Sequence, residues 1–482
     1  MKKQINEVIF WFRNDLRVDD NPGLHKAIGK GCRTCLFIRT PEQWAGHHMA
    51  PIKINFIDRH LMLLAEQLAD FNIELRVITV PTYKDQVKLI LNEYRHCEIY
   101  ASSELELNET NRDDVLQSQN IKLTLFESDV LFPKGSILNK ESQMYKVFTP
   151  FKKAWLSVFA KGQLTADDAP RTKNQTDSRV VKNTNFDSNS KILSNHSEMS
   201  DKWPLADQLI NSILPNYIKH KVESYSLNRD LPWVKGTSGL SPYLAIGAIS
   251  IKRVVVMLTN QYPELMSRDI NTEASSGADV WLSELIWREF YRNILFQNPS
   301  LIKGHAFKAS YNNINWPNHN HLFQLWSEAK TGFPIIDAAI RQLVKTGWMH
   351  NRLRMITASF LTKNCLVNWR MGERFFMQHL IDGDFAANNG GWQWSSSSGC
   401  DAQPYFRVFN PITQSKKFDA EGNFIRKWLP ELAHIPTKYI HEPQSYLEQI
   451  GQHETYWPQI VNLSESRKQA ITFYKSIMPQ IG

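Results

Sequence analysis

The chain has 482 residues, of which 42% are hydrophobic and 22% are charged, which is ordinary globular usage and excludes general disorder. This length suits roughly three average domains, or one small and one large domain. Its 56 Lys and Arg residues outnumber its 48 Asp and Glu residues, giving a formal charge of +8. Such an excess favours a polyanionic partner if the basic residues are clustered.

Five cysteines at irregular spacing argue against a secreted disulfide framework and favour a reducing, cytoplasmic compartment. Cys32 and Cys35 form a C-x2-C pair without a second pair at zinc-finger spacing, so we interpret them as small core residues and expect no metal. The apolar run Val8 to Phe12 is too short for a signal sequence, and no later run is long enough to span a membrane.

The first 132 residues alternate short β-rich runs with helical periods. The expected strands are Val8 to Phe12, Cys35 to Ile38, Ile73 to Val80, Glu98 to Ala101 and Leu123 to Phe126. Between the second and third runs, apolar residues recur at steps of three and four along one helix face, at Ile54, Ile57, Leu61, Leu64 and Leu68. This alternation predicts a Rossmann-like α/β domain with a parallel sheet over residues 1–132.

Polar residues dominate the stretch from about Leu164 to Trp203, so we expect an interdomain linker within residues 133–205. The following part, residues 206–482, has many helical periods and little strand pattern, and we expect an all-α domain. One clear helix begins near Pro334. Its predicted core stripe is Ile336, Ala339, Ile340 and Leu343.

Two motifs in the early part of this all-α region carry polar groups. The turn from Thr237 to Ser241 is rich in hydroxyls and suits either a helix cap or a phosphate-binding turn. In the helix Trp281 to Arg292, Glu284 lies one turn from both Trp287 and Arg288. That neighbourhood is either an ordinary ion pair on an aromatic core helix or part of a ligand site.

A second group of motifs follows. Trp348 to Met355 is expected to be a helix with Asn351 and Met355 on one face, and His350 is either structural or functional. Asp382 and Asp384 bracket Gly383, so their carboxylates can accept bonds from sugar hydroxyls or a heterocycle N-H. The nearby indoles indicate electron chemistry or core packing. They are Trp348, Trp369, Trp392 and Trp394.

Taken together, these segments resemble the photolyase/cryptochrome family over essentially the whole chain. The resemblance is carried by Trp11 to Arg17, the Thr237 to Ser241 turn, WLSELIWREFYR, TGWMHNRLRM and DGDFAANNGGWQW. The pattern is most similar to bacterial class I cyclobutane pyrimidine dimer (CPD) photolyases. The resemblance implies an α/β antenna domain and a helical FAD domain, in which reduced FAD absorbs blue light, donates an electron to a flipped-out dimer, and regains it after the cyclobutane ring splits.

The resemblance also assigns flavin-binding residues. The implied FAD contacts are Tyr225, Thr237, Ser238, Gly239, Leu240, Ser241, Trp281, Glu284, Arg288, Asn351, Arg354, Asp382, Gly383, Asp384 and Asn388. Asn388 matches the position that faces flavin N5, where a neutral amide accepts a hydrogen bond without adding a second negative charge to the anionic reduced flavin. Plant cryptochromes have Asp there and animal cryptochromes Cys, so Asn indicates repair.

Substrate residues follow from the same comparison. The (6-4) photolyases place two histidines where this chain has Asn351 and Met355, so their absence favours CPD repair. Glu284 is implied to bond the dimer, and Trp287 and Trp394 to pack against it, with Glu284, Asn388, Asn351 and Met355 as the catalytic set. Arg229, Arg352 and Arg407 match positions on the DNA face.

Trp392, Trp369 and Trp316 match the family's electron relay, while Trp326, Trp348 and Trp428 are taken as packing. Asn108, Glu109 and Lys303 match positions that bind a 5,10-methenyltetrahydrofolate antenna, with deazaflavin as the alternative. We therefore expect a monomeric CPD photolyase acting on UV-damaged DNA. The competing hypothesis is a cryptochrome-like photoreceptor, which the foldable sequence beyond His441 disfavours, because such sensors usually carry a long disordered tail.

Overall fold

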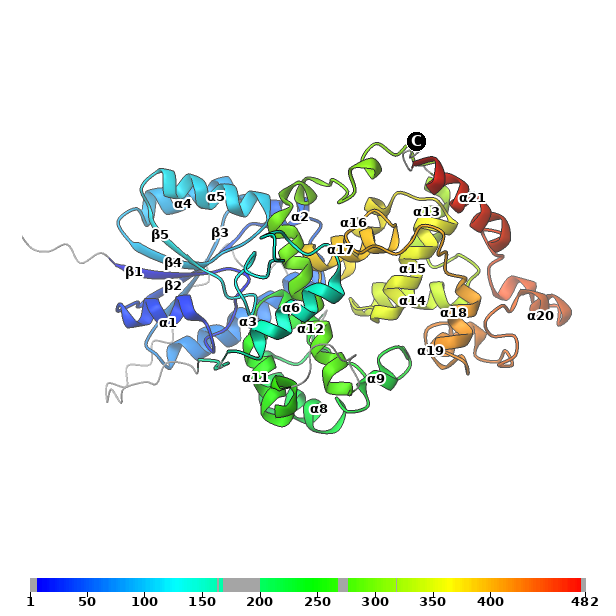
Figure 1. The fold of residues 1–482 in the computed structure, drawn as a ribbon, viewed down its shortest axis with the longest axis horizontal. Helices are drawn as coiled ribbons and strands as arrows, with labels where there is room; N and C mark the ends of the chain where they lie inside the picture. The colour runs from blue at the N-terminus through cyan, green and yellow to red at the C-terminus, as the bar shows by residue number, and fades with distance from the viewer. Residues whose placement is uncertain (1–6, 163, 168–199, 268–275, 318, 478–482) are drawn as a thin grey trace, which may run out of the picture. The chain divides into compact units, whose positions relative to one another are not determined.

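A computed structural model describes residues 7–162, 164–167, 200–267, 276–317 and 319–477. The chain divides into two compact units, shown as ribbons in Figure 1. Unit 1 comprises Met1–Tyr145, Pro150–Glu223 and Ser238–Ile302, and unit 2 comprises Lys146–Thr149, Ser224–Thr237 and Lys303–Gly482. The expected linker, 133–205, contains a helix, and its residues 168–199 lie outside the described part. The predicted domain boundaries therefore stay predictions.

Unit 1 contains a five-stranded sheet in the order β3-β2-β1-β4-β5, and every neighbouring pair is parallel. Its strands are β1 (Val8–Phe12), β2 (Thr34–Arg39), β3 (Glu74–Thr79), β4 (Glu98–Ser102) and β5 (Lys122–Phe126). Strands β1 and β2 are buried at every position, because helices cover both faces of a sheet of this kind. The predicted α/β fold class is confirmed, with each expected strand within two residues of its observed bounds.

Helices α1 and α3 cover one face of the sheet, and α4 and α5 the other (Figure 1). The helices that connect the strands are α1 (Pro22–Gly29), α2 (Pro41–Gly46), α3 (Pro51–Ala69), α4 (Tyr83–Glu93) and α5 (Leu107–Ser118). The stripe predicted for α3 faces inward, with Ile57, Leu61, Leu64 and Leu68 buried and Ile54 partly so. An apolar stripe at helical spacing is thus what seats α3 on the sheet.

The rest of unit 1 is helical. It contains most of α6 (Phe148–Phe159), α7 (Ala206–Gln208), the π-helix η2 (Leu209–Ile213), α8 (Leu214–His220), α10 (Ser241–Ala245), α11 (Ile251–Gln261), the 3-10 helix η3 (Pro263–Met266), α12 (Gly277–Gln297) and most of the 3-10 helix η4 (Pro299–Lys303). Helix α12, which carries the WLSELIWREFYR motif, begins where the Ser276 hydroxyl accepts a bond from the amide of Asp279.

Unit 2 is helical throughout its described length. Its α-helices are α9 (Tyr225–Asn228), α13 (Asn320–Ser327), α14 (Pro334–Thr346), α15 (Asn351–Ser359), α16 (Trp369–His379), α17 (Phe385–Ser395), α18 (Pro411–Phe418), α19 (Asn423–Trp428), α20 (Gln444–Gln449) and α21 (Leu463–Ile477). It also contains the π-helix η6 (Phe360–Asn364) and the 3-10 helices η5 (Ala309–Tyr311), η7 (Pro430–Leu432) and η8 (His453–Thr455). Helix α14 begins at Pro334, as predicted, and its expected stripe is fully buried.

The helix expected from Trp348 begins three residues later, at Asn351. The Nδ1 atom of His350 accepts a bond from the amide of Arg352 at 3.2 Å, so His350 caps the helix rather than entering it. Burial lowers the pKa of His350 to about 4, which keeps the ring neutral. His350 thus caps α15, as the structural interpretation predicts.

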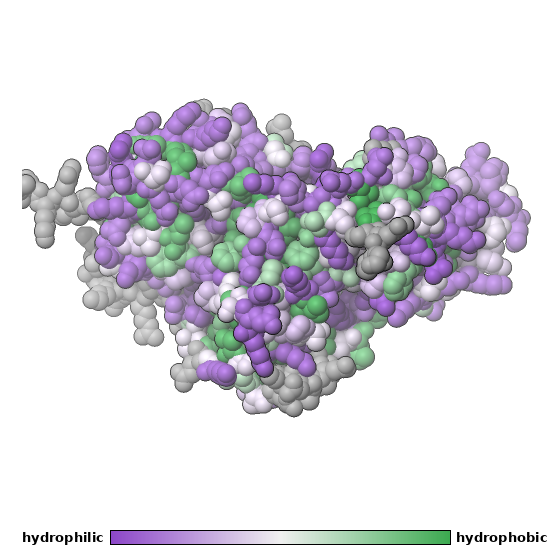
Figure 2. All heavy atoms as spheres, turned by 45° about the horizontal axis from the view of Figure 1, so that its top comes forward, coloured by the Kyte–Doolittle hydropathy of each residue, from purple (hydrophilic) through white to green (hydrophobic). Residues whose placement is uncertain are grey.

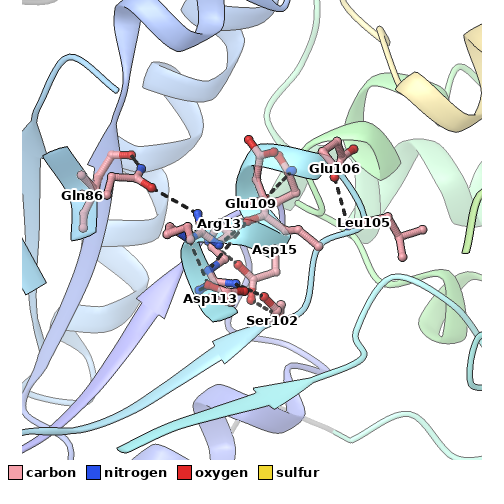
Figure 3. Close-up of polar contacts among 12 residues, drawn as sticks. Arg13, Asp15, Gln86, Ser102, Leu105, Glu106, Glu109 and Asp113 are labelled. Carbon is pink, nitrogen blue, oxygen red and sulfur yellow. Dashed lines mark hydrogen bonds and ion pairs between the residues drawn. The ribbon is translucent and has the colours of Figure 1, made fainter. Parts of the chain in front are cut away.

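The Trp11 to Arg17 motif forms a buried polar cluster in unit 1 (Figure 3). The Arg13 guanidinium donates to both carboxylate oxygens of Asp113 at 2.7 Å and to the Ser102 carbonyl at 2.8 Å. The Asp15 carboxylate accepts from the Arg13 amide at 2.7 Å and from the Ser102 hydroxyl at 2.5 Å. Buried charges are costly unless they are paired and hydrogen-bonded, and Arg13 meets the opposite charge of Asp113, so this motif has a structural role.

None of the helices within the described ranges is long and apolar enough to cross a bilayer. Hydrophilic residues cover most of the face drawn in Figure 2, with hydrophobic residues interspersed among them.

We predict that Asp113→Asn lowers the free energy of unfolding by about 3–5 kcal/mol, because it removes the buried carboxylate that bonds both Arg13 and Arg112 and leaves these two guanidinium groups only Glu104 as a counter-charge. Urea denaturation followed by circular dichroism measures the change. Asp114→Asn, an exposed neighbour on the same helix, is the matched control and should change stability by less than about 0.5 kcal/mol. Equal effects of the two substitutions would contradict the structural role of the cluster.

Candidate functional site

A turn between α16 and α17 holds two carboxylates in unit 2. The Arg354 guanidinium donates to the buried Asp382 carboxylate at 2.8 and 3.1 Å, and its Nε donates to the Met349 carbonyl at 2.8 Å. Asp384 caps α17 by accepting a bond from the Ala387 amide at 2.9 Å. Both predicted carboxylates are therefore held in place by α15 and α17, as a ligand site requires.

The first turns of α17 present a chain of amides to Glu373 on α16. Asn388 Nδ2 donates to the Glu373 backbone carbonyl at 3.0 Å, and Asn389 Nδ2 donates to the Glu373 side chain at 2.8 Å. Gln393 Nε2 in turn donates to Asn389 Oδ1 at 2.8 Å. Burial raises the pKa of Glu373 to about 7, against the opposing effect of the Asn389 bond. We call Glu373, Asn388, Asn389 and Gln393 the amide network.

Sequence reasoning missed Glu373. In the sequence Met371-Gly372-Glu373-Arg374, Glu373 is an isolated carboxylate, and this pattern predicts only an exposed position on a helix. Its role depends on the packing of α16 against α17, which no spacing rule reveals.

The predicted relay indoles lie in the hydrophobic core of unit 2. Trp316, Trp369 and Trp392 belong to one buried cluster. The ring of Trp392 contacts Phe376 at 5.0 Å and Trp326 at 6.2 Å between centroids, and the guanidinium of Arg370 lies 4.6 Å from the Trp369 ring. Trp326, expected to be packing only, is thus the indole in ring contact with Trp392. The relay itself stays a prediction.

Gly372 makes room for Trp392. A Cβ atom at this position would lie 2.0 Å from an atom of the Trp392 ring, far inside van der Waals contact. The glycine therefore sets how closely α16 and α17 approach, and with it the position of the amide network.

Basic residues of the predicted DNA face meet a shared carboxylate in unit 2. The Arg352 guanidinium donates to Asp230 Oδ1 at 2.8 and 3.2 Å, and Arg229 Nε lies 3.9 Å from the same oxygen. Arg407 is exposed, as is Asn351, while Met355 and Trp394 are half-buried. Tyr225 is buried beneath Arg229, whose guanidinium lies 5.7 Å from its ring, and Thr237 is half-buried.

The remaining predicted flavin and dimer residues belong to unit 1, on α12 and α10. Trp281 is buried against Tyr217 at 5.6 Å, whereas Glu284 and Trp287 are half-buried. Arg288 donates to the backbone carbonyls of Asp129 and Leu244. The predicted residues are thus divided between the two units.

The turn before α10, Thr237 to Ser241, does not cap this helix with a side chain, contrary to the helix-cap interpretation. The cap residue of α10 is Leu240, which makes no side-chain capping bond, and Gly239 has a φ of +68° that favours glycine. The capping interpretation of this turn is therefore wrong for α10, and the phosphate-binding interpretation stays a prediction.

The predicted antenna residues Asn108 and Glu109 lie in the first turn of α5. Asn108 Nδ2 lies 2.9 Å from Nε2 of His47, and Glu109 accepts a bond from the Gln43 side chain. Burial raises the pKa of Glu109 to about 8, and the neighbouring Glu104 and Glu106 raise it further. Lys303 is exposed and belongs to unit 2, whereas Asn108 and Glu109 belong to unit 1, so a common antenna site of the three residues stays a prediction.

Comparisons with known proteins give matches over most of the chain. A family model described as the DNA photolyase domain matches residues 8–172, and one described as the FAD binding domain of DNA photolyase matches residues 281–476. A deoxyribodipyrimidine photo-lyase of Vibrio cholerae is 41% identical over 97% of this chain and 99% of the relative.

Solved structures give the same result. A bacterial class III photolyase from Agrobacterium tumefaciens superimposes with a TM-score of 0.81 at 30% identity, covering 99% of this chain and 98% of that one. An archaeal photolyase from Sulfolobus tokodaii, solved with two FAD molecules, gives 0.78 at 29% identity, covering 98% and 100%. The fold and the comparisons together define a flavoprotein class with an α/β domain followed by a helical FAD-binding domain. The chain belongs to the DNA photolyase family.

We predict that Gly372→Ala lowers the free energy of unfolding by about 1–3 kcal/mol, because the new methyl group displaces the Trp392 ring. Denaturant titration of the holoprotein measures it. Gly391→Ala is the matched control on α17, where nothing lies within 4 Å of the added carbon. There the change should stabilise by about 0.5–1 kcal/mol through helix propensity, and a similar gain at position 372 would contradict the packing argument.

Proposed function

We propose that this chain is a light-driven enzyme that repairs cyclobutane pyrimidine dimers, and that the turn and amide network of α15 to α17 hold its flavin. The observation that carries the proposal is the fixed amide of Asn388. Because its Nδ2 donates to the Glu373 carbonyl, its oxygen is the end left to accept a hydrogen bond from a ligand.

These side chains fit the chemistry of FAD. A neutral amide accepts a bond from a protonated ring nitrogen without adding charge beside an anionic ring, and the Asp382 and Asp384 carboxylates suit hydroxyl and ring N-H donors. Arg354 adds the positive charge that a diphosphate needs. Bound FAD, in its reduced form, supplies the light-excited electron that opens the cyclobutane ring.

We assign the dimer contacts to three side chains that the resemblance to the family implies. Glu284 accepts from the pyrimidine edge, and Trp287 and Trp394 stack against the flipped bases, each stacked base contributing about 1–3 kcal/mol. Asn351 and Met355 occupy positions where proton-transferring histidines would suit a different lesion. Neither is buried, so both are accessible to a ligand.

Arg229, Arg352 and Arg407 are assigned to phosphate binding. In the free protein, the Arg352 guanidinium donates to the Asp230 carboxylate. We propose that a phosphate replaces this carboxylate when DNA binds. Each arginine-phosphate contact then contributes about 0.9 to the slope of log affinity against log salt concentration. These three arginines contribute to the net charge of +8, which favours binding of a polyanion such as DNA.

Trp392, Trp369 and Trp316 are proposed as the route by which an oxidised flavin is photoreduced. Support comes from their common place in one buried cluster, where electron transfer does not compete with solvent.

For the antenna, we propose 5,10-methenyltetrahydrofolate at Asn108 and Glu109. With a pKa of about 8, Glu109 is protonated at neutral pH, so its carboxyl group both donates and accepts hydrogen bonds, as a pterin edge requires. The alternatives are a deazaflavin and a second FAD, and the two FAD molecules of the Sulfolobus tokodaii structure favour the latter. The absorption spectrum of the holoprotein separates the three.

We further propose that the enzyme works as a monomer in the cytoplasm. All five cysteines are free and buried, which supports a reducing compartment.

The proposed function predicts that purified, chemically reduced protein under blue light restores thymine monomers in a dimer-containing oligonucleotide, and that it does not do so in the dark. Chromatography of the digested oligonucleotide measures the product. Failure under illumination, with FAD bound, would favour the photoreceptor hypothesis. Trp392→Phe serves as an internal control: pre-reduced variant should repair nearly as well as wild type, while photoreduction of its oxidised form slows.

A further inference from the structure

Lys363 is fully buried in unit 2 and has no carboxylate among its hydrogen-bond partners. It lies in η6, and its ammonium group donates to the Arg407 carbonyl at 3.0 Å, the Pro404 carbonyl at 3.3 Å and the Gln403 side-chain oxygen at 3.4 Å. All of these oxygens belong to the segment 396–410 between α17 and α18, which we call the exit loop. A buried charge that meets only neutral oxygens is costly, so it requires an explanation beyond packing.

A second lysine supports the same segment. Lys308 donates from its ammonium group to the Ser397 carbonyl, and from its backbone amide to the Ser398 carbonyl, both at 2.9 Å. The groups that face Lys363 electrostatically are cationic. Burial lowers its pKa to about 7, and Arg407 and Lys308 lower it further.

The exit loop is also conformationally unusual. Ser397 and Asp401, neither of them glycine, have φ values of +67° and +48°, a region that side-chain-bearing residues rarely adopt. Residues in this strained conformation persist where the surrounding structure holds them in place, and they are frequent at functional sites.

The loop presents an exposed surface. Phe406 is 56% exposed, packs edge to face on Tyr405 at 5.5 Å, and stands beside the exposed Arg407. The side chain of Arg407 points to solvent while its carbonyl is held by Lys363. The buried lysine thus fixes the backbone from which an exposed cation and an exposed aromatic ring project.

We propose that Lys363 is a positioning residue for DNA binding, which holds the exit loop in the conformation that presents Arg407 to a phosphate of the damaged strand. This inference rests on the proposed function, since it needs DNA at this surface. Lys363 does not itself touch the DNA.

A positioning role and an ordinary packing role predict different changes in the free energy of unfolding when Lys363 is replaced. Between pH 7 and the ordinary lysine pKa of 10.5, the unfolded chain binds a proton that the folded chain does not, so stability rises with pH in this window. At pH 7 and below, the buried ammonium therefore costs stability. Replacing it with a neutral side chain of similar length should not destabilise the fold.

The test compares Lys363→Met with wild-type holoprotein, using fluorescence anisotropy with a dimer-containing oligonucleotide over a series of salt concentrations. We expect a roughly tenfold loss of affinity and a salt slope smaller by about one phosphate contact. The unfolding midpoint should be equal to or above that of wild type, and repair at saturating DNA should be unchanged. In an Arg407→Gln background, Lys363→Met should weaken binding no further.

Lys468→Met is the matched control, since it removes the same charge from an exposed position on α21 and should change affinity less than twofold. Unchanged affinity and salt slope in Lys363→Met, or an equal further loss in the Arg407→Gln background, would overturn the proposal. An unfolding midpoint of Lys363→Met below that of wild type would contradict the stability argument, and Lys363→Gln, which retains one donor group, then carries the affinity comparison. Absence of DNA binding by wild type would instead count against the proposed function.

Discussion

The site depends on the close approach of α16 and α17, which Gly372 allows and the amide network uses. Asn388, Asn389 and Gln393 lie along one helix, and the amides of Asn388 and Asn389 both bond Glu373 on the other. A buried carboxyl group with a raised pKa is costly unless it is hydrogen-bonded, so the network persists only while both helices keep their spacing. The orientation of the Asn388 amide, which we propose to face the flavin, is thereby coupled to the core packing around Trp392.

Each unit contains a buried charged side chain that hydrogen-bonds a neighbouring segment of the backbone. In unit 1, Arg13 and Asp113 form a paired, bidentate contact that secures the ends of the parallel strands. In unit 2, Lys363 meets backbone oxygens without an opposite charge. The first arrangement pairs each buried charge with an opposite charge, while the second, as we propose, holds a surface loop at a cost in stability. The two cases show why burial of a charge alone does not reveal its role.

Much of the fold could be predicted from local pattern. Buried parallel strands appear as short apolar runs and were located within two residues, and the apolar stripe that follows Pro334 placed the start of α14. The start of α15 could not be placed, because capping by His350 depends on the turn before it. The resemblance supplied Asn388 and the aspartates. Glu373, Asp230 and Lys363 carry no local signal, since each acquires its role from segments distant in the sequence.

The central claim, that the fixed, neutral amide of Asn388 faces the flavin, is tested most directly by the reduction potential of bound FAD in Asn388→Asp. Spectroelectrochemical titration should place the midpoint at least ~60 mV more negative than in wild type, a tenfold change for one electron, because a carboxylate repels the anionic reduced ring. FAD content should stay equal to that of wild type. An unchanged midpoint at equal FAD content would contradict the assignment of Asn388 to the flavin site.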